Sequence, residues 1–467
     1  MRIAWLKPFL VVKWRPLLII FAVIVIVSLL NPFGLVGTQH VLFGALLFAV
    51  GSWATNALDR SLTSILLIVL FLIFGKTPSL SILGYVWSDV ILLIATSSLL
   101  SVALGKNAWL RTILHRFVQK TTKRNLIFYI TPYVLGTILI FVIPQAFARV
   151  VLLAGLYEAL MRKDDDLKEQ RHAVFFQIYL AVTVTYMLFS NGDVVLNYAA
   201  LTFAGEDVSA ALMGLPWLKM MGVPTLVLAI AMLVLTRILF KKSLPSQPAL
   251  LFEQDVVTEK PDKLSGRKDA IGLILMIVVM VFWATEGMHG IAGWIPAFVA
   301  VIALFVMTRL DKSDLAAINP RFLIFLIAVF NIGQVLRNSG VMDAIMRTLE
   351  RIIPEGGTFI FLPTLVLVTM LLHMFLGSAV ATLSVVIPII LPLAVVTGVS
   401  PIQMTLALYV TANMHFILPF HHATMMIGVG RGHVKDRHML RYGLVMSVGI
   451  FLVVFGLYFP WWSLVAP

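Results

Sequence analysis

The sequence contains no cysteine and few charged residues. Only 12% of its 467 residues are Asp, Glu, Lys or Arg, which is about half the share that is typical of a soluble domain. The absence of cysteine excludes a disulfide, a thiolate nucleophile and a cysteine-ligated metal site. The shortage of charge excludes a water-exposed globular fold, because 60% of the residues are hydrophobic and too little polar surface would remain to cover them.

Long apolar runs separated by short polar segments fill the chain instead. The runs 16–30, 41–50 and 62–74 are typical of membrane helices, each of which needs about 20 apolar residues. We therefore predict an all-α polytopic membrane protein with about eleven transmembrane helices. The first run follows basic residues, but no small-residue cleavage site comes after it, so we interpret it as a membrane helix and not as a signal peptide. The spans are expected near 17–36, 39–57, 61–75, 86–105, 172–204, 217–240, 269–285, 290–308, 320–337, 402–429 and 439–460.

The net charge of +13 is concentrated in the loops. This distribution predicts an N-terminus in the cytoplasm, a C-terminus outside and a bacterial inner (plasma) membrane location, by the positive-inside rule. Loop lysines and arginines also attract anionic lipid headgroups, so we expect membrane lipids as partners and no nucleic acid. With that orientation the cytoplasmic segments hold all 35 basic residues except Lys76, Lys219, Arg337, Arg347, Arg351 and the intramembrane Arg149.

The two halves of the chain repeat a pattern at an offset of 232 residues. An apolar stripe at helical spacing lies in 106–124 and again in 338–355, and each is followed by a long apolar stretch, 125–161 or 357–395, that we predict to be a re-entrant hairpin. The stripes are Trp109, Leu110, Ile113, Leu114 and Phe117, and Val341, Met342, Ile345, Met346 and Leu349. The first segment is basic without an acid, whereas the second also contains acids. Similar units on opposite sides of the bilayer form an inverted-topology repeat, which predicts a solute site at mid-membrane depth.

Short polar motifs stand at the hairpin tips and within two spans. The second tip is GSAVATLSVVIPI, with Ser378 and Thr382, and the first is IPQAFARVVLL, with Gln145. The spans 172–204 and 402–429 are interrupted by Ser190-Asn191-Gly192-Asp193, and by Leu418-Pro419 followed by His421-His422-Ala423-Thr424. In this order of elements the chain resembles the divalent-anion:sodium symporter family of the ion-transporter superfamily, over about residues 85–465. That family carries a Ser-Asn-Thr motif at its hairpin tips. At the second tip of this chain Ser378 and Thr382 match, while Ala379 and Val380 replace the Asn and Thr. At the first tip Pro144, Gln145 and Ala146 stand in place of the motif.

The resemblance implies a homodimer in which a transport domain moves as an elevator against a scaffold. The scaffold would comprise spans one to three in 1–85 and the region 205–319 with a cytoplasmic linker at 241–268. The transport domain would comprise the first repeat, 86–204 (surface helix 106–124, hairpin 125–161, broken span 172–204), and the second repeat, 320–430 (surface helix 338–355, hairpin 357–395, broken span 402–429). The last span lies in 431–467.

Arg149 is the one basic residue inside an apolar hairpin. A central Arg disfavours membrane insertion by about 2.5–3.5 kcal/mol, so an opposite charge must compensate it. A small anionic solute could do so through a forked, charge-assisted contact. The alternative is a structural ion pair with Asp193, Glu158 or Asp89.

The interrupted spans are expected to face the same pocket. Backbone that leaves its helix at mid-depth persists only where protein or a wet cavity satisfies it, and the half-helix N-termini then attract an anion. The alternative for 190–193 is an ordinary loop near the outer surface. We predict solute contacts from Gln145, Arg149, Asn191, Asp193, Ser378, Thr382, His421, His422 and Thr424, and ion coupling through Ser190, Asp193, Ser378, His421 and His422.

Four histidines, His373, His415, His421 and His422, cluster near the second hairpin and its broken span. Because imidazole titrates near neutrality, they could carry protons in place of sodium. The cluster could also bind a transition metal, but the spacing from His415 to His422 crosses a predicted break and does not define a metal-ligand motif. The coupling ion is therefore sodium or a proton, and we expect no cofactor and no metal site. The function that fits is secondary active transport of a carboxylate-like anion.

Two other functions are compatible with parts of this pattern. A transporter-like membrane subunit of a cell-envelope biosynthesis or sensing complex would explain the replaced Ser-Asn-Thr residues. An enzyme using the histidines with Asp193 or Glu158 lacks any paired-carboxylate, HExxH or nucleophile-elbow motif. We therefore predict that the protein is not an enzyme.

Overall fold

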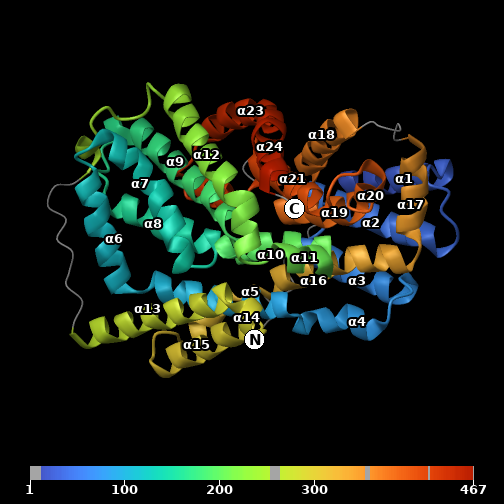
Figure 1. Ribbon diagram of the computed structural model, residues 1–467, viewed down its shortest axis with the longest axis horizontal. Helices are drawn as coiled ribbons and strands as arrows, with labels where there is room; N and C mark the ends of the chain where they lie inside the picture. The colour runs from blue at the N-terminus through green and yellow to red at the C-terminus, as the bar shows by residue number, and fades with distance from the viewer. Residues whose placement is uncertain (1–11, 253–262, 353–357, 419–420, 466–467) are drawn as a thin grey trace. The chain divides into compact units, whose positions relative to one another are not determined.

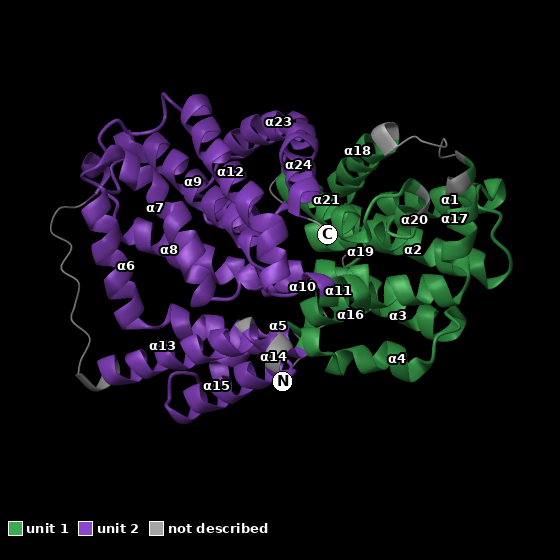
Figure 2. Cartoon of the chain, in the orientation of Figure 1, with its two compact units in different colours: residues 1–91, 199–210, 319–415 green, residues 92–198, 211–318, 416–467 purple. Residues whose placement is uncertain are grey.

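The computed structural model describes residues 12–252, 263–352, 358–418 and 421–465 (Figure 1). Within these ranges the secondary structure is helical apart from turns and one isolated β-bridge between Met161 and Phe252. The chain forms two compact units, each assembled from segments far apart in sequence (Figure 2). Unit 1 comprises residues 1–91, 199–210 and 319–415, and unit 2 comprises 92–198, 211–318 and 416–467.

Unit 1 is built around α2, α3 and α16. Trp53 of α2 packs edge-on against Phe325 of α16 at 5.1 Å between ring centroids. The amide of Asn331, buried within α16, donates to the carbonyl of Ile82 at 3.2 Å. The helices of this unit are α1 (Trp14–Leu30), α2 (Thr38–Thr55), α3 (Arg60–Phe74), α4 (Ser79–Gly84), α16 (Pro320–Asn338), α17 (Val341–Ile352), α18 (Thr358–Leu376), α19 (Ala379–Ile390), α20 (Leu393–Thr397) and α21 (Pro401–Met414).

Unit 2 is built around α9, whose residues 173–185 are all buried. Gln177 of α9 donates to the carbonyl of Tyr129 at 2.7 Å, and Gly136 lets α7 lie against Thr185. The helices of this unit are α6 (Ala108–Thr121), α7 (Asn125–Ile138), α8 (Ala146–Leu160), α9 (Lys168–Thr185), α12 (Leu215–Leu239), α13 (Lys263–Ala284), α14 (Glu286–His289), α15 (Trp294–Val306), α22 (Ala423–Gly430), α23 (Asp436–Val453) and α24 (Phe459–Val465). The chain passes between the units at five points. Three of these points lie within helices, namely α5 (Asp89–Gly105), α10 (Val194–Ala204) and α11 (Glu206–Leu212), and the other two lie between helices, at 318/319 and 415/416.

Helices occupy every span that the sequence predicts, and helix pairs occupy both predicted hairpins, α7–α8 and α18–α19. The long helix, amphipathic helix, helix pair and interrupted helix occur in this order twice, as α5 to α10 and as α16 to α22. Within the described residues, four helical segments are long and apolar enough to cross a membrane by length and composition, namely Ser79–Gly105, Leu215–Leu239, Lys312–Asn338 and Asp436–Val465. Shorter apolar helices occupy most of the remaining predicted spans, and their number of crossings stays a prediction.

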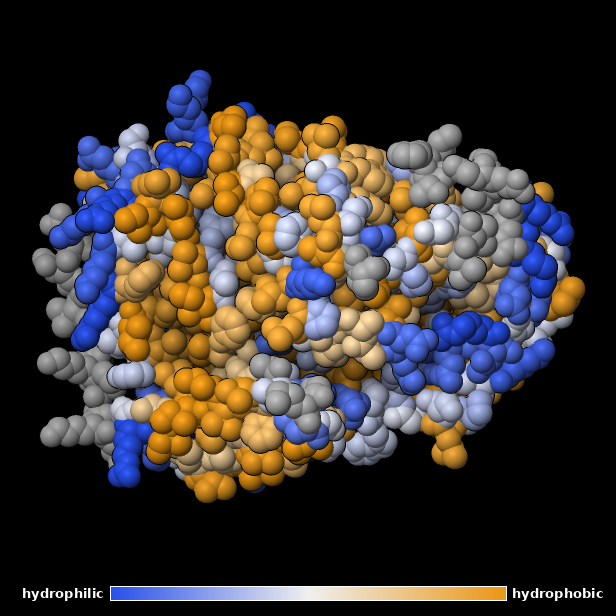
Figure 3. Space-filling model, viewed as in Figure 1, coloured by the Kyte–Doolittle hydropathy of each residue, from blue (hydrophilic) through white to orange (hydrophobic). Residues whose placement is uncertain are grey.

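Several helices of unit 2 expose apolar side chains on their outer faces. Hydrophobic residues cover α15, at the lower edge of the view in Figure 3. The exposed residues include Leu226, Ile230 and Val234 of α12 and Phe298, Val299 and Ile302 of α15. Contiguous apolar surface of this kind fits contact with lipid.

Both amphipathic helices form where the stripes predicted them. In α6 the stripe divides, because Leu110 and Leu114 are buried whereas Trp109, Ile113 and Phe117 are exposed. In α17, Val341, Met342 and Ile345 are buried; the side chain of Leu349 lies outside the described ones.

The linker predicted over 241–268 is shorter than expected. Helix α13 already begins at Lys263. Before residue 253 the chain is held against α7, since Tyr129 donates to the carbonyl of Pro245 at 2.7 Å and Asn125 to that of Ser246 at 3.0 Å. The carbonyls of Pro245 and Ser246 therefore fix the first part of the predicted linker to this helix.

Candidate functional site

The predicted interruption at 190–193 is present, and Ser190 and Gly192 within it are buried. Helix α9 tightens into 3₁₀ turns at Tyr186–Leu188 and Ser190–Gly192, and α10 starts afresh at Val194. Asn197 of α10 donates its amide to the carbonyls of Tyr186 and Phe189, at 3.1 and 2.9 Å. These bonds satisfy carbonyls that the break releases from helical pairing. The segment is therefore a broken helix and not an ordinary surface loop.

Gly192 is required by the geometry of the break. A Cβ atom at this position would lie 1.9 Å from the carbonyl oxygen of Tyr186, which no side chain tolerates. The close approach directs the carbonyl of Gly192 toward the first hairpin, where it accepts a hydrogen bond from Nη2 of Arg149.

Arg149 lies in the first turn of α8, directly after the tip of the first hairpin, and is 0% exposed. Its Nη1 donates to the carbonyl of Ile143 at 2.8 Å. Its Nε is buried with no hydrogen-bond partner among the described residues. The two hydrogen bonds hold the guanidinium at the hairpin tip. Because both acceptors are neutral carbonyls, another group must compensate the positive charge of Arg149.

Asp193 supplies the opposite charge. Its carboxylate interacts electrostatically with Arg149 and accepts a hydrogen bond from the backbone of Ala146, the first residue of α8. Its Oδ1 also accepts from the backbone N–H of Val195 at 3.3 Å, in the first turn of α10. The carboxylate thus lies at the N-termini of two helices, where the macrodipoles favour an anion. Of the alternative ion pairs considered from sequence, the one with Glu158 is wrong, because Glu158 contacts Nε2 of His433 at 3.3 Å.

The hairpin tip and the break are bonded to each other. Val194 donates its N–H to the carbonyl of Pro144 at 3.2 Å. Together Arg149, Asp193 and the N-termini of α8 and α10 form one polar centre, which we call the tip–break centre. It lies within unit 2.

The other predicted contacts near this centre are engaged with neighbouring helices. Gln145 donates to the hydroxyls of Ser97 and Ser98 in α5, at 3.2 and 2.8 Å. Ser190 accepts from the N–H of Gly214 at 3.2 Å, and Asn191 lies 3.7 Å from the sulfur of Met280. These three side chains therefore connect the residues around the centre to neighbouring segments of unit 2.

The second half of the other interrupted span also reaches α9. His422 contacts the hydroxyl of Tyr186 through Nε2 and that of Thr424 through Nδ1, both at 2.8 Å. The Thr424 and Thr183 hydroxyls lie 2.8 Å apart. Tyr186 and Thr183 were not predicted, although hydroxyl side chains immediately before Ser190-Asn191-Gly192-Asp193 were a usable signal. His421 accepts from the N–H groups of Ile417 and Leu418, at 3.2 and 3.3 Å, and Pro419 of the predicted break lies outside the described residues.

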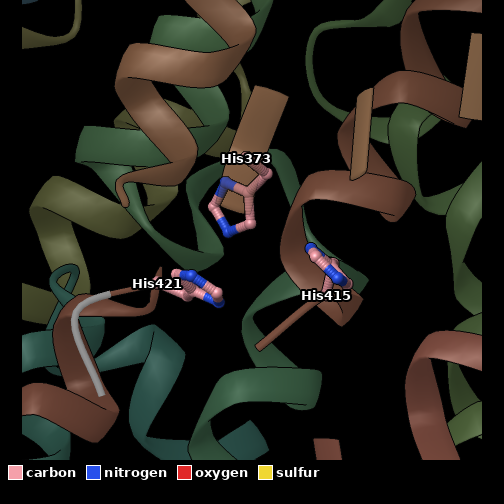
Figure 4. A group of neighbouring side chains, drawn as sticks. All are labelled: His373, His415 and His421. Atoms are coloured by element: carbon pink, nitrogen blue, oxygen red, sulfur yellow. The ribbon is translucent and has the colours of Figure 1, made fainter. Parts of the chain in front are cut away.

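The predicted residues of the second hairpin lie in unit 1. Ser378 caps α19, accepting from the N–H of Ala381 at 3.5 Å. Thr382 donates to the carbonyl of Ser378 at 2.9 Å and contacts Nδ1 of His373 at 2.8 Å. The rings of His373 and His415 stand edge to face, 5.7 Å apart (Figure 4). The same figure draws His421, which belongs to unit 2.

Repeated helix pairs beside interrupted helices, with apolar side chains exposed on helices such as α12 and α15, are an architecture typical of membrane transporters. The chain belongs to the family described as the sodium:sulfate symporter transmembrane region, whose sequence model matches residues 11–467. The resemblance to the divalent-anion:sodium symporters is thereby confirmed, and with it a location in a membrane.

Two known proteins are similar over most of the chain. A membrane protein of Cupriavidus necator is 22% identical over 484 residues, which cover 94% of this chain and 90% of that protein. The crystal structure of the YdaH transporter of Alcanivorax borkumensis, which has an unusual topology, aligns with a TM-score of 0.57 at 14% identity. That alignment covers 87% of this chain and 99% of the other. At this identity the likeness supports the fold alone.

Proposed function

We propose that the protein is a secondary active transporter of a small, carboxylate-like anion. The observation that supports this most directly is the tip–break centre, in which the fully buried Arg149 stands beside the N-termini of α8 and α10. Two helix ends and a guanidinium favour negative charge in a medium of low dielectric constant. An interrupted helix beside a hairpin tip is also the arrangement that transporters use to bind a solute within the membrane.

The family supports an elevator cycle as part of this proposal. Hairpins and broken spans would carry the solute as a transport domain, while the remaining spans hold a homodimer in the bacterial inner membrane, with a cytoplasmic N-terminus and an outer C-terminus. Ser378 and Thr382 of the second hairpin would contribute hydroxyls after releasing their local bonds. The coupling ion would be sodium or a proton.

Reconstituted protein tests the proposal. Liposomes preloaded with an unlabelled anion and given the same labelled anion outside report counterflow, which needs no driving gradient; succinate, citrate, lactate and sulfate serve as probes. We expect saturable counterflow of at least one probe. Arg149→Ala should lower it by about two orders of magnitude, the cost of about 2–3 kcal/mol for a lost charged hydrogen bond.

Two variants sharpen the result. Arg149→Lys keeps the positive charge but lacks the guanidinium group that can donate two parallel hydrogen bonds to one anion. This variant should therefore retain partial activity. Arg116→Ala removes an exposed cation of α6 and should leave counterflow unchanged. A folded wild type with no counterflow of any probe would contradict transport and favour the transporter-like subunit. Full activity in Arg149→Ala would remove this side chain from the solute site.

A further inference from the structure

The tip–break centre already contains an anion, the carboxylate of Asp193. It lies against the N–H groups of Ala146 and Val195, which open α8 and α10, and it interacts with the charge of Arg149. These are the groups that the proposed function assigns to the solute. A solute anion and an ionised Asp193 therefore compete for the same donors and the same cation.

The charges of the centre make this competition strong. Among the described residues, the titratable groups that interact with Asp193 are Arg149 of α8 and Tyr186 at the end of α9. Tyr186 is hydrogen-bonded onward to His422 of the second interrupted span. One cation thus faces one carboxylate, and their charges sum to zero. A solute anion entering beside ionised Asp193 would give the buried centre a net negative charge, which a low dielectric constant disfavours.

We propose that Asp193 couples transport to protons by acting as a tethered competitor of the solute. A proton from the outer solution binds the carboxylate and neutralises it, which frees Arg149 and the two helix ends for the solute anion. After the centre faces the cytoplasm, the anion leaves, Asp193 gives its proton to water there, and the carboxylate returns to Arg149. One proton thus crosses with each anion. The inference rests on the proposed function and names its coupling ion.

The cycle needs both the carboxylate of Asp193 and the proton that neutralises it. Without the carboxylate, Arg149 would attract the solute at every pH, and binding and release of the solute would no longer depend on a proton. Without the proton, the solute would be excluded by charge. The break in the helix allows Asp193 to gain and lose its proton, because the residue follows Gly192 in a non-helical stretch and its side chain is only partly buried.

Two assays on the reconstituted wild-type protein separate coupling from transport. The probe is whichever of succinate and sulfate gives the larger counterflow. Net uptake is then driven either by a pH gradient, alkaline inside, or by a sodium gradient at equal pH, with the membrane potential clamped at zero. Protein-free liposomes correct for leakage. We expect the pH gradient to drive accumulation, by up to about tenfold per pH unit for one proton per anion, and the sodium gradient to drive none.

Asp193→Asn tests the residue. The amide keeps the shape and a carbonyl acceptor but cannot bind the coupling proton. We expect counterflow to persist while the response to the pH gradient is lost, and the dependence of counterflow on pH to flatten. Asp193→Glu restores a titratable carboxyl and should recover the pH-driven uptake, which also guards against a variant that fails to fold. His422→Gln breaks the neighbouring bond to Tyr186 and should lower counterflow, but the uptake that remains should stay pH-driven.

Several results would overturn the inference without touching the proposed function. These are accumulation driven by sodium and not by pH in the wild type, undiminished pH-driven uptake in Asp193→Asn, and loss of pH coupling in His422→Gln alone. Absence of counterflow in the wild type would instead contradict the proposed function itself.

Discussion

The hydroxyl of Tyr186 and Nε2 of His422 lie 2.8 Å apart although 236 residues separate them. Each belongs to one of the two interrupted spans, at the point where the regular helix ends or restarts. The bond therefore joins the two repeats of the chain within unit 2. Its neighbours extend it through Thr424 to Thr183.

Tyr186→Phe should destabilise the protein and weaken counterflow. The change leaves the ring in place but deprives buried His422 of a partner, which costs about 1–3 kcal/mol. Thermal unfolding in detergent and counterflow measure the two effects. Tyr157→Phe is the matched control, because the hydroxyl of Tyr157 is equally buried and has no hydrogen-bond partner among the described residues. A similar loss in both variants would mean that the hydroxyl bond to His422 contributes nothing specific.

Gly192→Ala should abolish transport and prevent the break from forming as described. The added methyl would meet the Tyr186 carbonyl at 1.9 Å, so the chain must move and the acceptor for Arg149 moves with it. Gly155→Ala in α8 is the control, since no atom lies within 4 Å of its added methyl and alanine stabilises a helix interior by about 0.5–1 kcal/mol. Monodispersity in detergent and counterflow distinguish the variants. An active, monodisperse Gly192→Ala protein would show that the close approach is not needed.

Glu169 should contribute acid-sensitive stability at the start of α9. It accepts from Lys435 at 2.5 Å and from Arg437. Burial acts to raise the pKa of Glu169, but the hydrogen bonds from these two cations outweigh it and the pKa falls to about 2. Because the folded pKa lies below the usual 4.5, the contribution is complete above pH 4.5 and is lost as the pH falls toward 2.

The measurement is the unfolding temperature between pH 6 and pH 3. Glu169 is 36% exposed, so Glu169→Gln should cost only about 1 kcal/mol at pH 6 and progressively less at acid pH. Asp165→Asn, an exposed carboxylate in the preceding turn, should leave the difference between the two pH values unchanged. An equal loss for Glu169→Gln at both pH values would contradict the ion-pair account.

Asp269 should hold the amphipathic helix α6 against α13. Its buried carboxylate pairs with Arg309 and accepts from the N–H groups of Ala108 and Trp109, at 3.1 and 3.3 Å, at the start of α6. Asp269→Asn keeps one carbonyl acceptor but removes the negative charge that pairs with Arg309, and it should cost about 1–3 kcal/mol. Thermal unfolding of Asp269→Asn, Arg309→Gln and the double variant gives the coupling energy. Strictly additive losses would show that the pair does not act as a unit.

The secondary structure could be predicted because its signals are local. The positions and lengths of the apolar runs predicted where the helices lie. Gly192, which stands between polar residues, predicted where one of these helices breaks. The position of Arg149 in an apolar hairpin was enough to expect a buried counter-charge. Such features depend on neighbours within a few residues, and the bilayer requirement for satisfied backbone makes them strong.

The choice of partners could not be predicted in this way. Glu158 and Asp193 were equal candidates for Arg149 in sequence, yet one contacts His433 and the other lies at two helix ends. The hydrogen bonds from Gln145 to Ser97 and Ser98 could not be predicted either. The sequence by itself determined helices, hairpins, breaks and the presence of an intramembrane charge. Only the tertiary structure decided which carboxylate compensates that charge, because side-chain pairing depends on distances between segments that no local pattern encodes.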